Sequence, residues 1–132
     1  MFDYPAKILL AFGETFSGNE KIFNWLLKNG YPELAALSAA IRGSEESSQW
    51  LRNNGYPELS ALDAAIDKNQ DAKFWLLKNK YKNLLLFADA CNNNERAIKW
   101  FIKNDLKIFL LLAKKINDFR DNQIFDVHKI HF

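Results

Sequence analysis

The sequence predicts an all-α protein, an α-solenoid of about five stacked helix-turn-helix hairpins. Two observations carry this prediction: an internal repeat of 25 residues, and a helical spacing of apolar residues within each copy. Five Gly and three Pro are too few for a turn-rich all-β domain, while 48% hydrophobic and 26% charged residues are typical of a globular chain. We expect residues 1–132 to form a single domain.

The repeat is marked by four tryptophans, each 25 residues from the next: Trp25, Trp50, Trp75 and Trp100. A tyrosine follows six residues after the first three, and apolar residues recur nine, twelve and sixteen residues after all four. The approximate repeats are 4–30, 31–55, 56–80, 81–105 and 106–132. Because one short hairpin cannot bury its own apolar face, neighbouring copies are expected to stack.

Each copy is expected to form two short helices. In the second copy, Pro32 suits the first turn of a helix over residues 32–42, whose apolar residues lie three and seven positions apart. A second helix is expected over residues 45–53, and both spans shift by 25 in the other copies. Ser44 can cap this second helix, as can its equivalents Asn19, Asn69 and Asn94. We expect each tryptophan to lie on the buried side of its helix, with the apolar residue that follows it.

The third copy resembles the helical part of an ankyrin repeat. The residues that carry the resemblance are Ser60, Leu62, Ala65, Asn69, Leu76 and Leu77. Ankyrin units have 33 residues, and the stretch that is missing here is their projecting β-hairpin. The resemblance implies an ankyrin-like solenoid without β-hairpin fingers, with the first helices on a concave surface of the kind that binds proteins. Short helical repeats of the HEAT-like kind are the alternative identification.

No catalytic or metal-binding motif is visible. The sequence lacks a Walker loop, a Gly-x-Gly-x-x-Gly fingerprint and a His-Glu-x-x-His motif. Cys91 falls in the phase of Ile41 and Ile66, which indicates a buried small residue rather than a nucleophile. The two histidines, His128 and His131, have no visible third ligand for a metal. We expect no enzymatic activity, no metal and no cofactor.

Charges are distributed unevenly, although the net charge is only +2. The exposed ridge expected on the first helix of each copy consists of small and partly acidic residues. The ridge residues expected to make polar contacts with a partner are Arg42, Asp63, Asp67 and Asp89. The second helices of repeats three to five carry a basic face that includes Lys78, Arg96, Lys99 and Lys103. We expect a non-catalytic protein–protein interaction module or scaffold that binds through the ridge. The alternative is nucleic-acid backbone binding through the basic face, and ordinary solubilising charge is the plainer interpretation of both faces.

The sequence also bears on location. Its longest apolar run, residues 108–113, is far short of the ~20 residues that span a bilayer. A single cysteine excludes a disulfide framework, and the acidic N-terminal residues do not resemble a signal peptide. We expect a cytoplasmic protein with no membrane partner, and the sequence does not indicate an oligomeric state.

Overall fold

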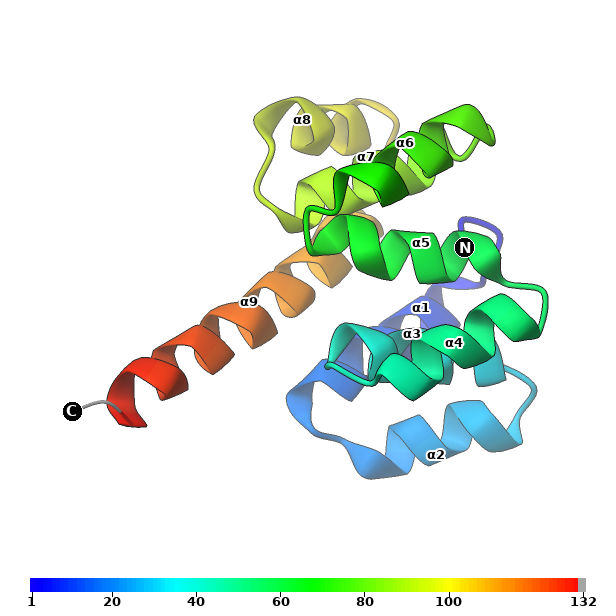
Figure 1. Cartoon of the computed structure of the whole chain (residues 1–132), viewed down its shortest axis with the longest axis vertical. Coiled ribbons are helices and arrows are strands. Elements are labelled where there is room, and N and C mark those ends of the chain that lie inside the picture. The colour runs from blue at the N-terminus through cyan, green and yellow to red at the C-terminus, as the bar shows by residue number, and fades with distance from the viewer. Residues whose placement is uncertain (131–132) are drawn as a thin grey trace.

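The structure, a computed structural model, describes the backbone of residues 1–130 and the side chains of residues 1–121. This described part is helical and contains no strand, which confirms the all-α class (Figure 1). Its helices are α1 (Ala6–Glu14), η1 (Thr15–Ser17, a 3-10 turn), α2 (Glu20–Lys28), α3 (Pro32–Ile41), α4 (Glu45–Asn53), α5 (Pro57–Ile66), α6 (Gln70–Lys78), α7 (Lys82–Cys91), α8 (Glu95–Lys103) and α9 (Lys107–Ile130). Among the described residues, no helix is both long and apolar enough to cross a membrane.

Polar side chains fix both ends of the even-numbered helices. The Asn19 side chain accepts a hydrogen bond from the Ile22 N–H at 3.1 Å, where the sequence predicts a cap. The equivalent caps of the next three even-numbered helices are Ser44, Asn69 and Asn94. At the other end, an asparagine side chain donates at 2.8 Å to the carbonyl of the tryptophan four residues earlier; these asparagines are Asn29, Asn54, Asn79 and Asn104. These bonds satisfy backbone groups that a short helix otherwise leaves to water.

The core is built from the apolar stripe of the odd-numbered helices. One residue of each stripe is almost or fully inaccessible at equivalent positions of the repeat: Phe12, Leu37, Leu62, Phe87 and Leu112. The even-numbered helices add the residue directly after each tryptophan, and these are also fully buried: Leu26, Leu51, Leu76 and Phe101. The apolar pattern therefore predicts the core correctly in all the copies.

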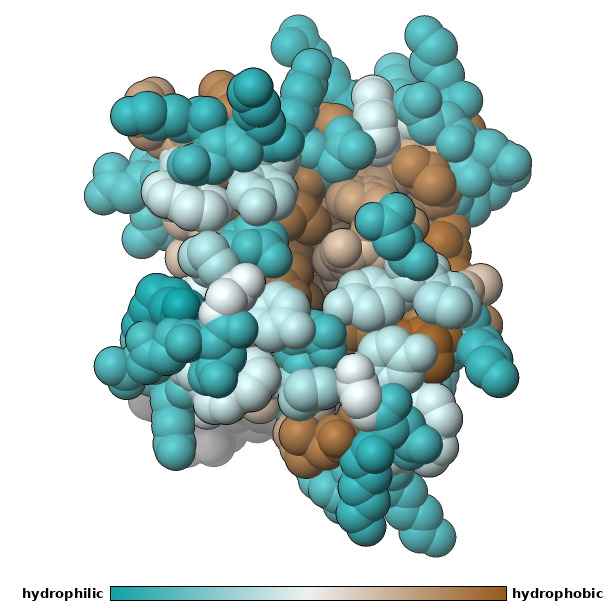
Figure 2. Space-filling view, turned by 90° about the vertical axis from the view of Figure 1, so that its right-hand side faces the viewer, coloured by the Kyte–Doolittle hydropathy of each residue, from teal (hydrophilic) through white to brown (hydrophobic). Residues whose placement is uncertain are grey.

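The tryptophans pack at the edge of this core: Trp75 and Trp100 are partly buried, and the prediction of a buried tryptophan is wrong for the other two. Trp25 is 43% exposed and Trp50 is 37% exposed. Successive helical residues point about 100° apart, so a tryptophan and the leucine after it cannot share one narrow buried face. The first three tryptophan rings instead stack on the tyrosine six residues later, in the pairs Trp25–Tyr31, Trp50–Tyr56 and Trp75–Tyr81, with centroids 5.8–6.4 Å apart. Figure 2 faces the end of the molecule where the turns after these helices lie, and pale and brown residues interrupt its hydrophilic surface.

The odd-numbered helices close into a ring. α1, α3, α5, α7 and α9 pack in chain order, and α9 also packs against α1. Each even-numbered helix packs on the two odd-numbered helices that flank it in sequence. The closing contact is tight, since a Cβ atom at Gly13 would lie 2.8 Å from Leu112 Cδ2. Lys115 Nζ lies 3.1 Å from a carboxylate oxygen of Glu14 across the same contact.

In the fifth copy, residues 107–130 form one long helix, so the prediction of a fifth hairpin is wrong. In the first four copies, the turn between the two helices pairs a residue of positive φ with a capping residue: Gly18–Asn19, Gly43–Ser44, Lys68–Asn69 and Asn93–Asn94. The fifth copy has Asp118 and Phe119 at these positions, and a phenylalanine side chain cannot accept a capping hydrogen bond. α9 therefore continues to Ile130 and extends beyond the other helices in Figure 1.

The left-handed turns predict a stabilising substitution. Gly30 and Gly55 have a φ of 90°, and the equivalent residue of the third copy is Lys80, with a φ of 69°. Because a non-glycine residue in this conformation costs about 1 kcal/mol, Lys80→Gly should raise the free energy of unfolding by about 0.5–1 kcal/mol. Urea unfolding at constant m-value measures the change. Lys99→Gly, inside α8, should instead lower stability by about 1 kcal/mol, and equal effects of the two would contradict the strain.

The ring closure predicts a destabilising substitution. Gly13→Val places a branched side chain where Leu112, itself fully buried, cannot move away. We expect a loss of about 1–3 kcal/mol in thermal or urea unfolding, as for other overpacked cores. Ala6→Val, at the exposed start of the same helix, is the control and should change stability by less than about 0.5 kcal/mol. If both variants unfold alike, α1 does not close against α9.

Candidate functional site

The predicted ridge of first-helix residues is not one exposed surface. Ser38 and Ala88, two of the small residues on the helix face that the sequence predicts to be exposed, are fully buried between the helices of the ring. The closure of α1 onto α9 turns the odd-numbered helices toward one another, and a 25-residue period does not reveal this closure. Of the four ridge residues expected to contact a partner, the structure brings only Asp63 and Asp67 to the same groove.

The other two residues of the predicted ridge are engaged in contacts within the chain. The Arg42 guanidinium lies over the Phe23 ring, 5.1 Å from its centroid, and 3.9 Å from a carboxylate oxygen of Glu20. Asp89 pairs with Lys73 Nζ at 3.3 Å, with both side chains about three-quarters buried. These contacts join neighbouring helix pairs, which is a structural role.

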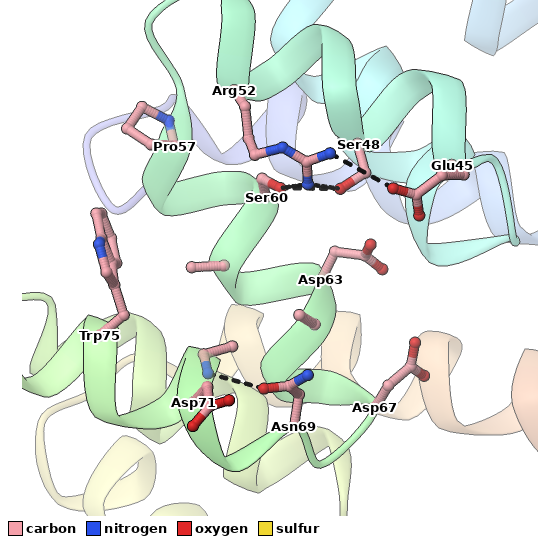
Figure 3. A pocket seen from close by; sticks show the side chains of 13 residues that line it. Glu45, Ser48, Arg52, Pro57, Ser60, Asp63, Asp67, Asn69, Asp71 and Trp75 are labelled. Carbon is pink, nitrogen blue, oxygen red and sulfur yellow. Dashed lines mark hydrogen bonds and ion pairs between the residues drawn. The ribbon is translucent and has the colours of Figure 1, made fainter.

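An acidic groove of about 620 Å³ lies between α4, α5 and α6. Figure 3 shows α4 on one side of it, α6 on the other, and Asp63 projecting from α5 between them. Its charged lining residues are Glu45, Arg52, Asp63, Asp67 and Asp71. Four carboxylates and one guanidinium give this groove an excess of negative charge. The ring of Trp75 and the pyrrolidine of Pro57 supply its apolar wall.

The single cation among the lining residues of the acidic groove, Arg52, is already bound within the chain. Arg52 Nη1 donates to Ser60 Oγ at 3.1 Å and to Ser48 Oγ at 3.4 Å, and Arg52 Nη2 lies 3.4 Å from Glu45 (Figure 3). The two serine hydroxyls also hydrogen-bond to each other at 2.8 Å. This network fastens α4 to α5 along one wall. It leaves the carboxylates on the other side of the groove without this guanidinium.

Asp63 is the unusual residue of the acidic groove. The equivalent positions of the other copies hold small neutral residues that are buried in the ring: Gly13, Ser38, Ala88 and Ala113. Burial is the largest cause that raises the pKa of Asp63, to about 6, followed by the carboxylates of Asp67 and Glu45, while Arg120 and Arg52 lower it. Within the described part of the chain, no hydrogen bond or ion pair reaches its carboxylate.

Helix α9 contributes a residue that the sequence does not point to. Arg120 Nη1 donates to the Ile66 carbonyl at 2.8 Å and to Asn92 Oδ1 at 3.3 Å, and Arg120 Nη2 lies 3.3 Å from Asp67. The Asp67 side chain is 69% exposed, so this ion pair is weak. The contact depends on α9 continuing past the position where the other copies turn, so a repeat alignment cannot find it.

An apolar groove of about 260 Å³ lies one copy earlier, between α2, α3 and α4. Its lining residues are Phe23, Leu27, Pro32, Ala36, Glu46, Ser47 and Trp50. Each of the seven has its equivalent, 25 residues later, in the lining of the acidic groove. Phe23 becomes Ser48 and Leu27 becomes Arg52, while the proline, the alanine and the tryptophan recur. The same repeat position therefore forms grooves of two different chemistries.

The predicted basic face is exposed but lies outside both grooves. Lys78 is at the end of α6, and the other three residues of the face, Arg96, Lys99 and Lys103, are on α8. Large apolar side chains stand beside them, since Phe74 is 65% exposed, Leu77 54% and Ile102 51%. Nucleic-acid binding through this face stays a prediction.

Cys91, the nucleophile considered in the sequence, does not line either groove. Cys91 is fully buried, and burial raises the pKa of its thiol, as expected for a core residue. Among the described residues, no group of three His, Cys, Asp or Glu side chains is arranged to hold a metal ion. His128 and His131 lie outside the described side chains.

The raised pKa of Asp63 predicts how stability depends on pH. The folded chain holds this proton more tightly than the unfolded chain, whose value is near 3.8, so ionised Asp63 costs stability above pH 6. At pH 8 we expect Asp63→Asn to unfold at a higher urea concentration than the parent chain. Its free energy of unfolding should be greater by about 2 kcal/mol, after allowance for solvent screening. The advantage should shrink as the pH falls through 6 and vanish near pH 4. Parallel stability curves of the two proteins would contradict a perturbed Asp63.

Comparisons with known proteins give no match. No protein-family model, curated protein or solved structure matches this chain. The ankyrin-like identity of its helix pairs therefore stays a prediction from the sequence, and its function has to be argued from the grooves themselves.

Proposed function

We propose that the chain is a non-catalytic protein-binding module that takes a lysine or arginine side chain of a partner into the acidic groove. As expected from the sequence, the function is protein binding and the repeat unit is an ankyrin-like hairpin. The binding position is the acidic groove between α4, α5 and α6 rather than a concave ridge. The main support is the partly buried carboxylate of Asp63 in this groove.

Asp63 is a carboxylate that the fold does not need. Four equivalent positions use glycine, serine or alanine where the helices of the ring approach each other. Placing a charge there works against folding at neutral pH, because burial disfavours its ionised form. Residues that break the local rule of a fold without a structural gain are candidates for function. A cation from a partner would offset this cost.

A lysine–aspartate ion pair joins the next two helices of the chain. On α6, Lys73 extends toward α7 and pairs with Asp89 at 3.3 Å. One copy earlier, Ser48 stands at the position of Lys73 and the alanine after Asp63 stands at the position of Asp89, so this pair has no counterpart beside the acidic groove. Within the described residues, no lysine pairs with Asp63. The Trp75 ring in the groove wall adds a surface on which a cation can rest.

The same contacts favour binding over catalysis. The Ser48 and Ser60 hydroxyls are bonded to each other and to Arg52, so no general base activates either of them. The carboxylates of Glu45 and Asp71 stand on opposite walls of an open groove, where they favour a cation on electrostatic grounds alone.

A peptide selection tests the proposal. Peptides selected from a random display library on the immobilised chain should be enriched in Lys and Arg, and their affinity should fall with added salt. The Asp63→Asn, Asp67→Asn double variant should raise their Kd at least about tenfold, because two groove charges are lost. Since the first substitution is expected to stabilise the fold, a binding loss would not reflect unfolding.

The matched control changes the other face. The triple variant Lys78→Glu, Lys99→Glu and Lys103→Glu should leave the affinity for the selected peptides nearly unchanged. If this variant abolishes binding and the parent chain binds a DNA duplex with steep salt dependence, the nucleic-acid alternative replaces the proposal.

A further inference from the structure

The acidic groove and the apolar groove lie on opposite sides of one helix, α4. Trp50 and Glu46 of this helix line the apolar groove, whereas Glu45 and Arg52 line the acidic one. Their floors, α3 and α5, pack against each other. Axes of packed helices lie about 8–10 Å apart, so equivalent points of the two grooves are separated by about this distance. One ligand chain that crosses α4 can therefore reach both.

The spacing fits a short step of extended chain. A polyproline II segment advances about 3.1 Å per residue and thus about 9 Å in three residues. The walls of both grooves are helices, whose backbone groups are bonded within each helix, so they offer no strand edge for β-pairing. A polyproline II segment needs no such partner, because water satisfies its backbone.

The lining of the grooves specifies the two side chains. Phe23, Leu27 and Trp50 form a small apolar space of about 260 Å³, which suits a compact ring such as that of proline. Trp50 is 37% exposed and its ring is held by stacking on Tyr56, so it is fixed in place before a ligand arrives. The acidic lining on the other side of α4 suits a cation.

We propose that the ligand is an extended, proline-containing segment of a partner protein, with proline in the apolar groove and lysine or arginine three residues away in the acidic groove. This inference rests on the proposed function, because it names the chain that carries the basic residue. It makes the distance between two side chains, rather than charge alone, the quantity that the protein recognises.

A series of synthetic peptides tests the spacing. Fluorescein-labelled peptides of one length and composition carry one proline and one arginine, separated by one to six positions in either order. Fluorescence anisotropy should give the lowest Kd at a separation of three, about tenfold below separations of one and five. The order that binds more tightly defines the direction of the chain across α4.

Two tryptophan variants separate this spacing from general effects on the fold. Trp50→Ala should raise the Kd of the three-residue peptide about tenfold and abolish the preference for that separation. Trp25→Ala is the matched control, because Trp25 is 43% exposed and also stacks on a tyrosine but does not line the apolar groove. This control should leave the preference intact.

The outcomes distinguish the two proposals. If all separations bind equally and Trp50→Ala behaves like Trp25→Ala, while Asp63→Asn still weakens binding, the paired-groove inference is overturned and the proposed function stands. If Asp63→Asn weakens no peptide, both fail.

Discussion

The odd-numbered helices approach one another so closely that only small side chains fit where they meet. Where α1 meets α9, even a Cβ atom at Gly13 would collide with the buried Leu112. The ring therefore demands small residues at one position of every repeat, and glycine, serine and alanine meet the demand in four of five copies. The even-numbered helices pack on the ring rather than on each other, so grooves form between them over an odd-numbered floor. Asp63 is the exception to the demand, and it lies at the bottom of such a groove.

Local structure could be predicted from the sequence because it depends on residues close in the chain. The caps at Asn19 and Ser44, the helix starts at Pro32 and Pro57, and the buried phase of Leu37 all follow from short-range spacing. The burial of the tryptophans is harder to predict, since a repeated aromatic residue suggests a core position. The first three tryptophans stack on the tyrosine six residues later, which also recurs in the sequence. Because this tyrosine lies across a turn, helical periodicity does not predict which way its side chain points.

What could not be predicted depends on contacts between distant copies. A fixed period describes a stack but does not say whether its ends meet, as α1 and α9 do, or that Ser38 and Ala88 are buried between helices. The continuation of α9 brings Arg120 to Asp67, 53 residues away. Of the four predicted binding residues, Arg42 and Asp89 contact side chains of neighbouring helices, and Asp63 and Asp67 share the acidic groove. A groove between three helices becomes visible only when their spacing is known.

Repetition also explains how one scaffold can hold grooves of different chemistry. The backbone of each copy is set mainly by its caps, its turns and its buried stripe. The groove positions at Phe23 and Ser48 pack beside that stripe, and they vary between copies, from an apolar residue to a hydroxyl and then to Lys73. Proline and tryptophan recur in the lining of both grooves, although the acidic groove, at about 620 Å³, is larger than the apolar groove, at about 260 Å³. Under the proposed function, a ligand that contacts neighbouring copies would be recognised by the order of their groove chemistries, which the closed ring of helices holds at a fixed spacing.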